Sequence, residues 1–591
     1  MRPSSIRRLA AVCLAAGALR SAFADQPLPR TAADLFQLET VWRIHLKFSA
    51  DQWKAMQPNE PEGFGPGPGG PGRPGRPGGP GGRGGGFGPG MFLAPAWMQQ
   101  GDANRDGQLT AAEFEGLGNR WFDAWDKERQ GSLTENALRD GLSASLGGPG
   151  GPGGPGGPGG PGGPGGPGGP GGPGGGESFL QGRNGSRNGL SAARGIEFPF
   201  VRADLEFEGQ SFPEVAVRYK GNGTFMQSRG GLKRSFKIDL NKHQKGQKLG
   251  GVTTLNLHNN ITDASWMNEP LAHRLYREAG VPAPRSSYAR VHVSVPGLHT
   301  NAYLGLYSLV ENPDERFAEE RYGTKKGLIL KPVTQRLFEH LGDDWSRYQQ
   351  AYDPKNDPTA AQKARFLALC RLVSEAPDEE FAARIGDFVD LDAVSRYLAV
   401  TVWISTLDSI LGMGQNFLAY LNPKTDRFEL WPWDLDHAFG QFGMTGSQEE
   451  RENLSLREPW TRDIRFLQRL MKVPRFSELY LGAMKKYQDT LFQPARLQGQ
   501  VDALARVLRP AVAEEDADKL QRFDQVVAGQ PVPPAGPFGG GPGGRGGPGG
   551  PGGFPGMPRM TPPKPIKGFV EARHASVRRQ LTDPAAGQRI Q

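Results

Sequence analysis

The chain has 591 residues and a formal net charge of +8, with 86 Gly and 52 Pro. These residues concentrate in three tracts, roughly 63–90, 147–176 and 535–557, which lack apolar side chains to offset ordering entropy. We expect linkers there, although glycine at every third position of the middle tract would also permit a collagen-like triple helix. The remaining sequence suffices for one large domain of roughly 350 residues and one small domain.

The N-terminus has the pattern of a secretory signal peptide over residues 1–24. Three arginines precede a short apolar run at 9–19, and Ala22-Phe23-Ala24 fits a small-x-small cleavage site. Neither this run nor any later segment is long enough to cross a bilayer, so we expect an exported protein (periplasmic, cell-surface or extracellular) without a transmembrane segment. Cleavage would remove four Arg and no acid, lowering the net charge from +8 to +4, too little to indicate a nucleic-acid partner.

Only one cysteine, Cys370, would remain after cleavage. It lies in an apolar helical run, which predicts a buried thiol and excludes an intramolecular disulfide.

Residues 36–60 predict a strand at 41–48 and a helix capped by Ser49, followed by a linker at 61–90. Residues 91–146 then match an EF-hand pair. The first calcium loop is intact, with Gly107 at its sharp turn, and its oxygen ligands would be Asp102, Asn104, Asp106, Gln108 and Glu113. A second loop begins at Asp126 but has Ala137 in place of the closing carboxylate, so we expect it to be a structural mate that binds no ion.

A second linker is expected at 147–190, a large domain at 195–530, a third linker at 531–562 and a C-terminal segment at 563–591. The large domain begins with predicted hairpins and strands at 200–220, 234–240, 253–258 and 288–311. A helix from an Asp263 N-cap to Glu278 is expected among them, and the pattern becomes helical from about 360. Strands followed by helices favour an α+β fold over alternating βαβ units.

The most informative stretch runs from Asp408 to Gly440. Asp408 and Asn416 precede two predicted strands, "NFLAYL" and "RFELWPW", joined by the turn "NPKTD", and Asp434 and Asp436 follow them. Because a hairpin returns the chain to its start, we expect Asp434 to lie near Asp408 and Asn416. Such oxygen ligands suit Mg²⁺, although the carboxylates could instead cap local turns.

Other candidate residues precede this stretch in an order that fits phosphate binding. A turn with Gly221 and Gly223 follows a predicted strand, and such a turn can approach phosphates closely. The lysines Lys233 and Lys237 come next and could neutralise phosphate charge. Glu269 on a predicted helix could fix such a lysine, and Glu311 ends a predicted hairpin.

Together these stretches resemble the spore coat protein H (CotH) kinase family. The matching segments are "VRYKGNGTF", "LKRSFKIDL", "NITDASWMNEPLAHRL", "YLGLYSLVEN", "LDSILGMGQNFLAY" and "WPWDLDHAFG". The resemblance covers about 195–520 and includes 36–56. It implies an atypical, two-lobed protein-kinase-like fold, with a β-rich N-lobe and a helical C-lobe, into which the EF-hand pair is inserted.

The resemblance also implies ATP-dependent phosphorylation of protein Ser or Thr with Mg²⁺ or Mn²⁺. Asp408 would be the catalytic base, and Asn416 and Asp434 the metal ligands, with Asp436 supporting them or binding a second ion. Lys237 or Lys233 would hold the nucleotide phosphates, and Glu311 would lie where the base docks.

Two other interpretations remain open. Asp434-Leu435-Asp436 is also the Asp-x-Asp of sugar-nucleotide enzymes, but the alternating strands and helices of that fold are missing. A catalytically inactive, calcium-binding extracellular scaffold is the more serious alternative, because ATP is scarce outside the cell. The histidines His258, His292 and His437 lie in unrelated sequence contexts and are expected to be structural or exposed, and the aromatic residues form no nucleic-acid stacking platform.

Overall fold

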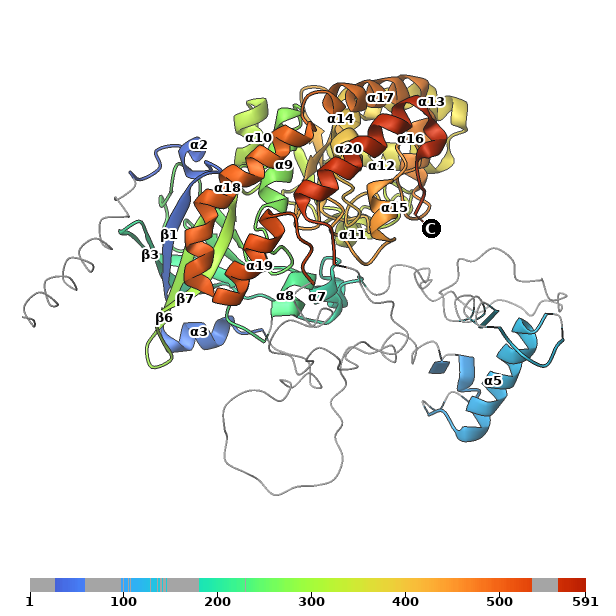
Figure 1. Ribbon diagram of the computed structural model, residues 1–591, viewed down its shortest axis with the longest axis horizontal. Helices are drawn as coiled ribbons and strands as arrows, with labels where there is room; N and C mark the ends of the chain where they lie inside the picture. Colours follow the sequence, from blue (N-terminus) through green and yellow to red (C-terminus); the bar gives the residue numbers. More distant parts are fainter. Residues whose placement is uncertain are drawn as a thin grey trace, which may run out of the picture. The chain divides into compact units, whose positions relative to one another are not determined.

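The computed structural model describes residues 27–58, most of 97–145, 180–533 apart from residue 229, and 562–590 (Figure 1). The chain divides into two compact units. The larger contains the described residues of 1–59, 196–546 and 560–591, and the smaller those of 60–195. The predicted signal peptide, the linker at 61–90 and most of the linkers at 147–190 and 531–562 lie outside the described residues.

Seven strands of the larger unit form a closed barrel in the order β1-β2-β3-β4-β5-β7-β6. Neighbouring strands are antiparallel except β1 and β6, whose parallel pairing closes the barrel. Alternate side chains point inward and form an apolar core. The strands are β1 (Val41–Lys47), β2 (Val201–Phe207), β3 (Gln210–Tyr219), β4 (Phe236–Asp239), β5 (Thr254–His258), β6 (Ser286–Val295) and β7 (His299–Val310).

A second, three-stranded sheet has the order β10-β9-β8, and its strand β10 packs against helices of the larger unit. Its strands are β8 (Leu328–Leu330), β9 (Phe417–Asn422) and β10 (Arg427–Pro432). The helices before the last strand pair are α2 (Ala32–Leu35), α3 (Ala50–Met56), α8 (Gly223–Ser228), α9 (Asn268–Glu278), α10 (Glu315–Tyr322), α11 (Ser346–Tyr352), α12 (Ala360–Glu375), α13 (Asp378–Phe388) and α14 (Leu391–Trp403). Those after it are α15 (Gln448–Glu452), α16 (Arg465–Lys472), α17 (Pro474–Gln488), α18 (Pro494–Glu515), α19 (Ala517–Val527) and α20 (Ile566–Thr582).

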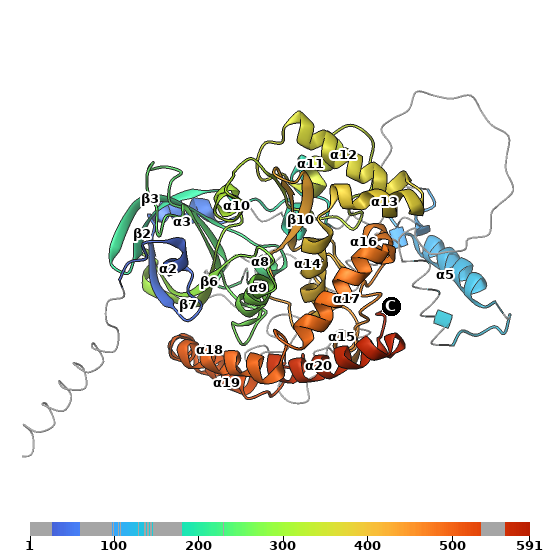
Figure 2. The same cartoon turned by 90° about the horizontal axis from the view of Figure 1, so that it is seen from above.

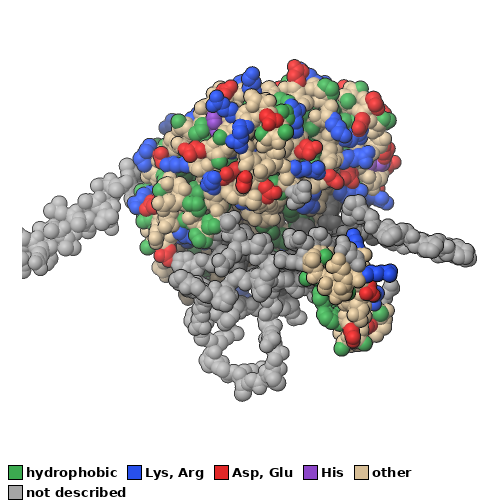
Figure 3. All heavy atoms as spheres, turned by 45° about the vertical axis from the view of Figure 1, so that its right-hand side comes forward, with side chains coloured by type: hydrophobic (Ala, Val, Ile, Leu, Met, Phe, Trp, Pro, Cys, Tyr) green, Lys and Arg blue, Asp and Glu red, His purple; other side chains and the backbone are tan. Residues whose placement is uncertain are grey.

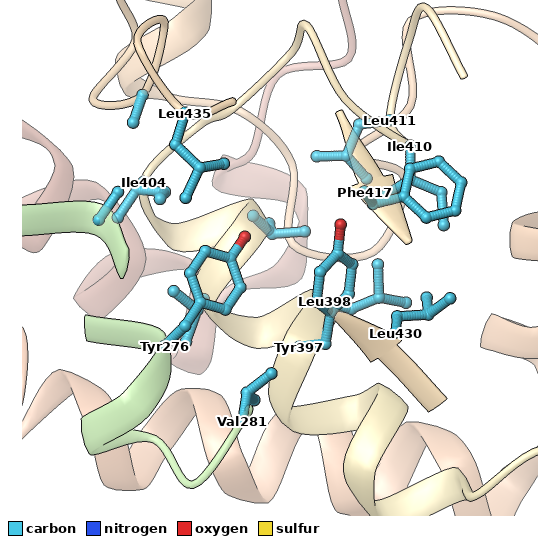
Figure 4. Close-up of a cluster of buried hydrophobic side chains, with 14 of the residues drawn as sticks. Tyr276, Val281, Tyr397, Leu398, Ile404, Ile410, Leu411, Phe417, Leu430 and Leu435 are labelled. Carbon is cyan, nitrogen blue, oxygen red and sulfur yellow. The ribbon is translucent and has the colours of Figure 1, made fainter. Parts of the chain in front are cut away.

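Figure 2 shows the barrel on one side of the larger unit and α12 to α17 on the other, with α9 between them. Helix α18 packs against β7 of the barrel and also against α20, so the last helices run along both parts. A large apolar core fills the helical part and includes the buried Cys370, as predicted. In Figure 4, Tyr276 of α9 lies beside Tyr397 of α14, with ring centroids 5.5 Å apart.

The predicted α+β class is confirmed, and so are the hairpins, the strand at 41–47 and the helix capped by Ser49. The predicted helix from Asp263 to Glu278 is wrong at its start, because α9 begins at Asn268. The Asp263 carboxylate instead accepts hydrogen bonds from the amides of Ser265 and Asn268, at 2.8 Å each. Trp266 has a positive φ of 58°, which a helix does not tolerate, so residues 263–267 form turns.

The surface of the larger unit carries both signs of charge. On the face drawn in Figure 3, Lys and Arg side chains are interspersed with Asp and Glu. No helix within the described ranges combines the length and the apolar character that crossing a bilayer requires.

The smaller unit contains α5 (Ala111–Trp125) and α7 (Leu190–Ala193). Thr110 caps α5 in a capping box with Glu113. Tryptophans hold this unit together: Trp97 contacts Trp121, and Trp121 stacks on Trp125 with ring centroids 5.3 Å apart.

Candidate functional site

The hairpin of β9 and β10 brings the two ends of the Asp408–Gly440 stretch together, as the sequence predicts. The two strands pair from Asn422 opposite Arg427 to Phe417 opposite Pro432. One residue beyond this ladder, the Trp433 backbone amide donates to the Asn416 backbone oxygen at 3.1 Å. Asp434 therefore comes directly after Trp433, which is hydrogen-bonded to Asn416. The negative charge of Asp434 helps to raise the pKa of Asp408.

Asp408 lies in a loop after α14, and two amide side chains fix its carboxylate. Asn416 donates from Nδ2 to the Asp408 backbone oxygen at 2.8 Å and to its carboxylate at 3.0 Å. Gln415 donates to the other carboxylate oxygen at 2.6 Å. Burial raises the pKa of Asp408, while His437 and these amides lower it. These hydrogen bonds hold the two carboxylate oxygens of Asp408 in a fixed orientation.

Glu269 and His258 meet Asp434 on the barrel side. His258 ends β5, Glu269 lies in the first turn of α9, and His258 Nδ1 is 2.6 Å from Glu269 Oε2. Among the described residues, these three form the one set of His and acidic side chains whose ligand atoms all lie within 4.8 Å of one another. The second oxygen of Glu269, Oε1, is buried without a hydrogen-bond partner there.

Lys220, the residue that follows β3, supplies a cation to this group. Its Nζ is 2.5 Å from His258 Nε2 and 4.9 Å from the centre of the Trp433 ring. Burial lowers the pKa of Lys220 to about 8, although Asp434 and Glu269 raise it. Burial also raises the pKa of Glu269 to about 8, assisted by Asp434. For Asp434, burial opposes ionisation, but the positive charges of Lys220 and Lys331 help to outweigh it and hold its pKa below the usual value.

Asp436 and His437 complete the acidic side of the cluster. Thr262 donates to the Asp436 carboxylate at 2.7 Å, and Asn268 donates to the Asp436 backbone oxygen at 2.8 Å. Burial raises the pKa of Asp436 to about 7, with His437 opposing this rise. Burial disfavours the charged form of His437, but Asp436, Asp408 and Asp434 outweigh burial and raise its pKa. His437 therefore neutralises part of the charge of three carboxylates.

A row of polar side chains crosses the outer face of the barrel beside this cluster. Lys237 on β4 pairs in register with Arg218 on β3 and with Asn256 on β5, so the three share one face. Asn256 is only 2% exposed although it lies outside the barrel, because other parts of the larger unit cover this face. Burial lowers the pKa of Lys237 to about 8, and Arg218 and Lys355 lower it further. The row is therefore a buried concentration of positive charge.

Two other predicted residues lie in ion pairs of their own. The Lys233 ammonium is 2.7 Å from Glu515 of α18 and lies over the Trp266 ring. Lys233 is therefore held where the barrel contacts α18. Glu311 accepts from Arg285 at 2.5 Å and from Arg321 at 2.8 Å. Both acidic partners are almost fully buried, with 4% of each side chain exposed, so these pairs join structural elements.

The glycine turn lies directly after Lys220. Gly221 has a φ of +110°, and a Cβ there would be 2.7 Å from Thr224 Oγ1, so the turn requires glycine. Gly223 is the first residue of the short helix α8 and has open space around it. The turn therefore follows the cluster's lysine without interruption.

Three residues of the cluster were not predicted as site residues: Lys220, His258 and His437. The two histidines were expected to be structural or exposed, and the structure places both among the carboxylates of the cluster. Strand alternation could have found Lys220 and His258. Tyr219 and Leu257 belong to the barrel interior, so the residues that follow them must face outward, on the side of Lys237 and Asn256.

The predicted calcium loop of the smaller unit is closed by its own hydrogen bonds. The Asp106 amide donates to Asp102 at 3.2 Å and to Asn104 at 2.9 Å, and the Gln108 amide donates to Asp106 at 2.8 Å. Glu113 accepts from the Ala103 amide at 3.1 Å, which connects the last loop position to the second. In the second loop, Asp126 accepts from the amides of Gln130 and Gly131.

The barrel, the helical part and the buried lysine–acid cluster between them define an α+β protein with a buried, charged site. A family model described as CotH kinase protein matches residues 217–530, more than half of the chain, and the chain belongs to this family. The inner spore coat protein H of Bacillus subtilis (strain 168) is 23% identical over 323 residues, which cover 53% of this chain and 82% of that protein. The residues that the family model matches, 217–530, include every residue of the cluster.

Proposed function

We propose that this protein is an exported protein kinase that transfers the γ-phosphoryl group of ATP to a Ser or Thr hydroxyl of a protein. The observation that carries the proposal is the convergence of Lys220, Glu269 and Asp434 with the fixed carboxylate of Asp408. Protein kinases need a lysine fixed by a helix glutamate, a metal-binding aspartate after a strand, and an aspartate that accepts the hydroxyl proton. This chain offers one candidate for each role.

The buried groups fit a nucleotide with a divalent metal. Lys220 and Lys237 would face the phosphates, because both are buried cations whose pKa burial lowers to about 8, and an anionic ligand would favour their charged forms. The carboxylate of Asp434 and the side-chain oxygen of Asn416 would supply hard oxygen ligands of the kind that Mg²⁺ or Mn²⁺ takes. The bound metal nucleotide would supply the phosphoryl group and spread its charge.

Asp408 would act on the acceptor. Its carboxylate, oriented by Asn416 and Gln415, would receive the proton of the Ser or Thr hydroxyl as the hydroxyl oxygen bonds to the γ-phosphorus and the bond from that phosphorus to the bridging oxygen breaks, releasing ADP. Because burial raises the pKa of Asp408, the group has more affinity for this proton than a solvated aspartate has. Asp434 and Lys220 would hold the metal and the phosphates of the nucleotide. Positioning and charge would therefore supply most of the rate acceleration.

Phosphate transfer from radiolabelled ATP by the mature protein tests the proposal. We expect incorporation with Mg²⁺ or Mn²⁺ and its loss in Asp408→Asn and Asp434→Asn, by roughly a hundredfold or more. Asp426→Asn is the matched control for Asp434→Asn. Both aspartates have a φ of 55°, which asparagine tolerates, but Asp426 is exposed in the β9–β10 turn.

The same measurements distinguish a kinase from a catalytically inactive scaffold. Nucleotide-dependent stabilisation without transfer would indicate a kinase-like protein that only binds, or an acceptor that was not supplied. Neither transfer nor stabilisation would contradict the kinase proposal and leave a calcium-binding extracellular scaffold as the better account.

A second function is favoured by the loop of the smaller unit. We propose that Asp102, Asn104, Asp106 and Glu113, with the Gln108 backbone, bind one Ca²⁺ ion. The support is the hydrogen bond between Glu113 and the Ala103 amide, which brings the closing carboxylate to the start of the loop.

A further inference from the structure

The C-terminal helix α20 lies outside the residues that the family model matches, yet it touches both loops that carry the acidic residues of the cluster. The family match ends at residue 530, and α20 spans Ile566–Thr582. It packs against α15, α17 and α18 in the helical part of the larger unit. Figure 2 shows it running on from the direction of α18 and α19 beneath α17.

The centre of α20 is attached through one buried arginine. Arg573 is fully buried and donates to four backbone oxygens. Two belong to the last residues of α14, Val402 at 3.0 Å and Trp403 at 3.1 Å, and the others to Glu452 at 3.1 Å and Leu454 at 2.7 Å. The last carbonyls of a helix have no partner within it and carry partial negative charge. A guanidinium there satisfies them and fixes the end of α14.

The end of α14 sets the position of Asp408, which follows Trp403 by five residues. Within this short connection, Ser405 has a φ of 50° and donates to the Arg451 oxygen at 2.8 Å. The Ile404 oxygen accepts from the Gly440 amide at 3.2 Å, which joins this connection to the loop after Asp436. A shift of α14 at Arg573 would therefore move both loops.

The start of α20 contacts that second loop directly. A Cβ on Gly440 would be 2.6 Å from the Phe569 ring, so the loop and α20 are in close contact. Gln441 donates to the Lys564 backbone oxygen at 2.8 Å, and the Lys564 ammonium is 2.7 Å from Glu452. Gly440 and Gln441 follow Asp436 and His437 by three to five residues. Helix α20 thus contacts the chain a few residues from each side of the acidic cluster.

We propose that α20 is a positioning element for the catalytic loops, and that Arg573 is its central positioning residue. This role of α20 rests on the proposed phosphoryl transfer, because α20 would keep Asp408 aligned with Asp434 for that reaction. Arg573 touches neither and acts through the end of α14. A displacement of reacting groups by about 1 Å can lower a rate by about a hundredfold, so this alignment matters to catalysis.

The test compares Arg573→Lys with Arg578→Lys in the full-length mature chain. Lysine keeps the charge but has no planar fork, so it cannot reach four carbonyls, whereas Arg578 is exposed on the same helix. For Arg573→Lys we expect kcat to fall at least roughly tenfold, with KM for ATP changed less than about twofold. Amide hydrogen exchange in 404–416 and 434–441 should accelerate in this variant. Arg578→Lys should match the wild type in each readout.

Each outcome is decisive. A lower melting temperature with unchanged kcat and unchanged exchange in the two loops would overturn the proposal and make α20 a structural brace. If Arg573→Lys does not fold, Phe569→Leu provides the same comparison at Gly440, where a smaller side chain loosens the loop contact. If the wild type transfers no phosphate, the proposed function fails, but loop exchange still decides whether α20 orders the two loops.

Discussion

The Lys220 ammonium lies 2.5 Å from Nε2 of His258, so an imidazole separates this lysine from Glu269. Protein kinases need a lysine fixed by a helix glutamate, and under the proposed function the corresponding connection would run through a histidine. Burial lowers the pKa of His258 well below its usual value, so the ring is neutral and can accept from the ammonium at Nε2. It would then donate from Nδ1 to Glu269. The chain of hydrogen bonds orients Lys220 toward Asp434.

The two buried lysines of the barrel should respond differently to substitution. Lys220→Met should abolish the thermal stabilisation by ATP with Mg²⁺, because it removes the cation beside Asp434. Lys233→Met should keep that stabilisation but lower the free energy of unfolding by about 3 kcal/mol, since it leaves the buried Glu515 with Lys519 as its remaining cation and the Leu306 amide as a hydrogen-bond donor. Thermal and urea unfolding with and without nucleotide measure both effects. If Lys233→Met loses the stabilisation by nucleotide while Lys220→Met keeps it, then Lys233 and not Lys220 is the lysine that binds the nucleotide.

Asp436 should make stability depend on pH in a direction opposite to that of a salt-bridged carboxylate. Burial raises its pKa from the ordinary 3.8 to about 7 in the folded protein, so the folded state keeps the proton to a higher pH. The unfolded chain binds fewer protons between pH 4 and 7, and stability therefore falls as pH rises through this window. In Asp436→Asn this contribution is absent.

Urea unfolding of the wild type and Asp436→Asn at several pH values between 4 and 7 checks this. The wild type should lose stability relative to the variant as pH rises. A difference between the two proteins that stays constant over the window would contradict the assigned pKa.

Glu113→Gln should weaken the proposed calcium binding by at least roughly tenfold, because Glu113 would be the closing ligand of the first loop. The matched control is Glu115→Gln, an exposed position on the same helix. Trp121 and Trp125 in the smaller unit provide a fluorescence signal for a calcium titration. Equal affinities in the two variants would show that Glu113 does not close the site.

Gly414 lies in the loop between Asp408 and Asn416 and should not tolerate a side chain. It has a φ of +66°, and a Cβ would be 1.9 Å from the Thr334 oxygen. Gly414→Ala should cost at least about 1–3 kcal/mol in unfolding free energy from backbone strain alone. Gly482 on α17 has open space around it, so Gly482→Ala should instead stabilise by about 0.5–1 kcal/mol. Comparable urea midpoints for the two variants would contradict this contrast.

Local patterns determined much of the fold. Alternating apolar residues predicted the strands of the barrel, and the Pro and Asn/Asp turn between β9 and β10 predicted a hairpin, which placed Asp434 near Asp408 and Asn416. The start of α9 was misplaced because an Asp before a helical pattern resembles an N-cap. Here Asp263 organises a turn that reaches Asn268.

The sequence by itself determined the α+β order, the hairpin that gathers the acidic residues and the pattern of the calcium loop, because each depends on residues close together in the chain. Only the tertiary structure decided which lysine joins the acidic cluster. Lys220 and Lys233 are equally basic in sequence, but barrel closure turns one toward Asp434 and the other toward Glu515 of α18. The role of Arg573 is likewise tertiary, since its carbonyl partners lie more than a hundred residues away in sequence.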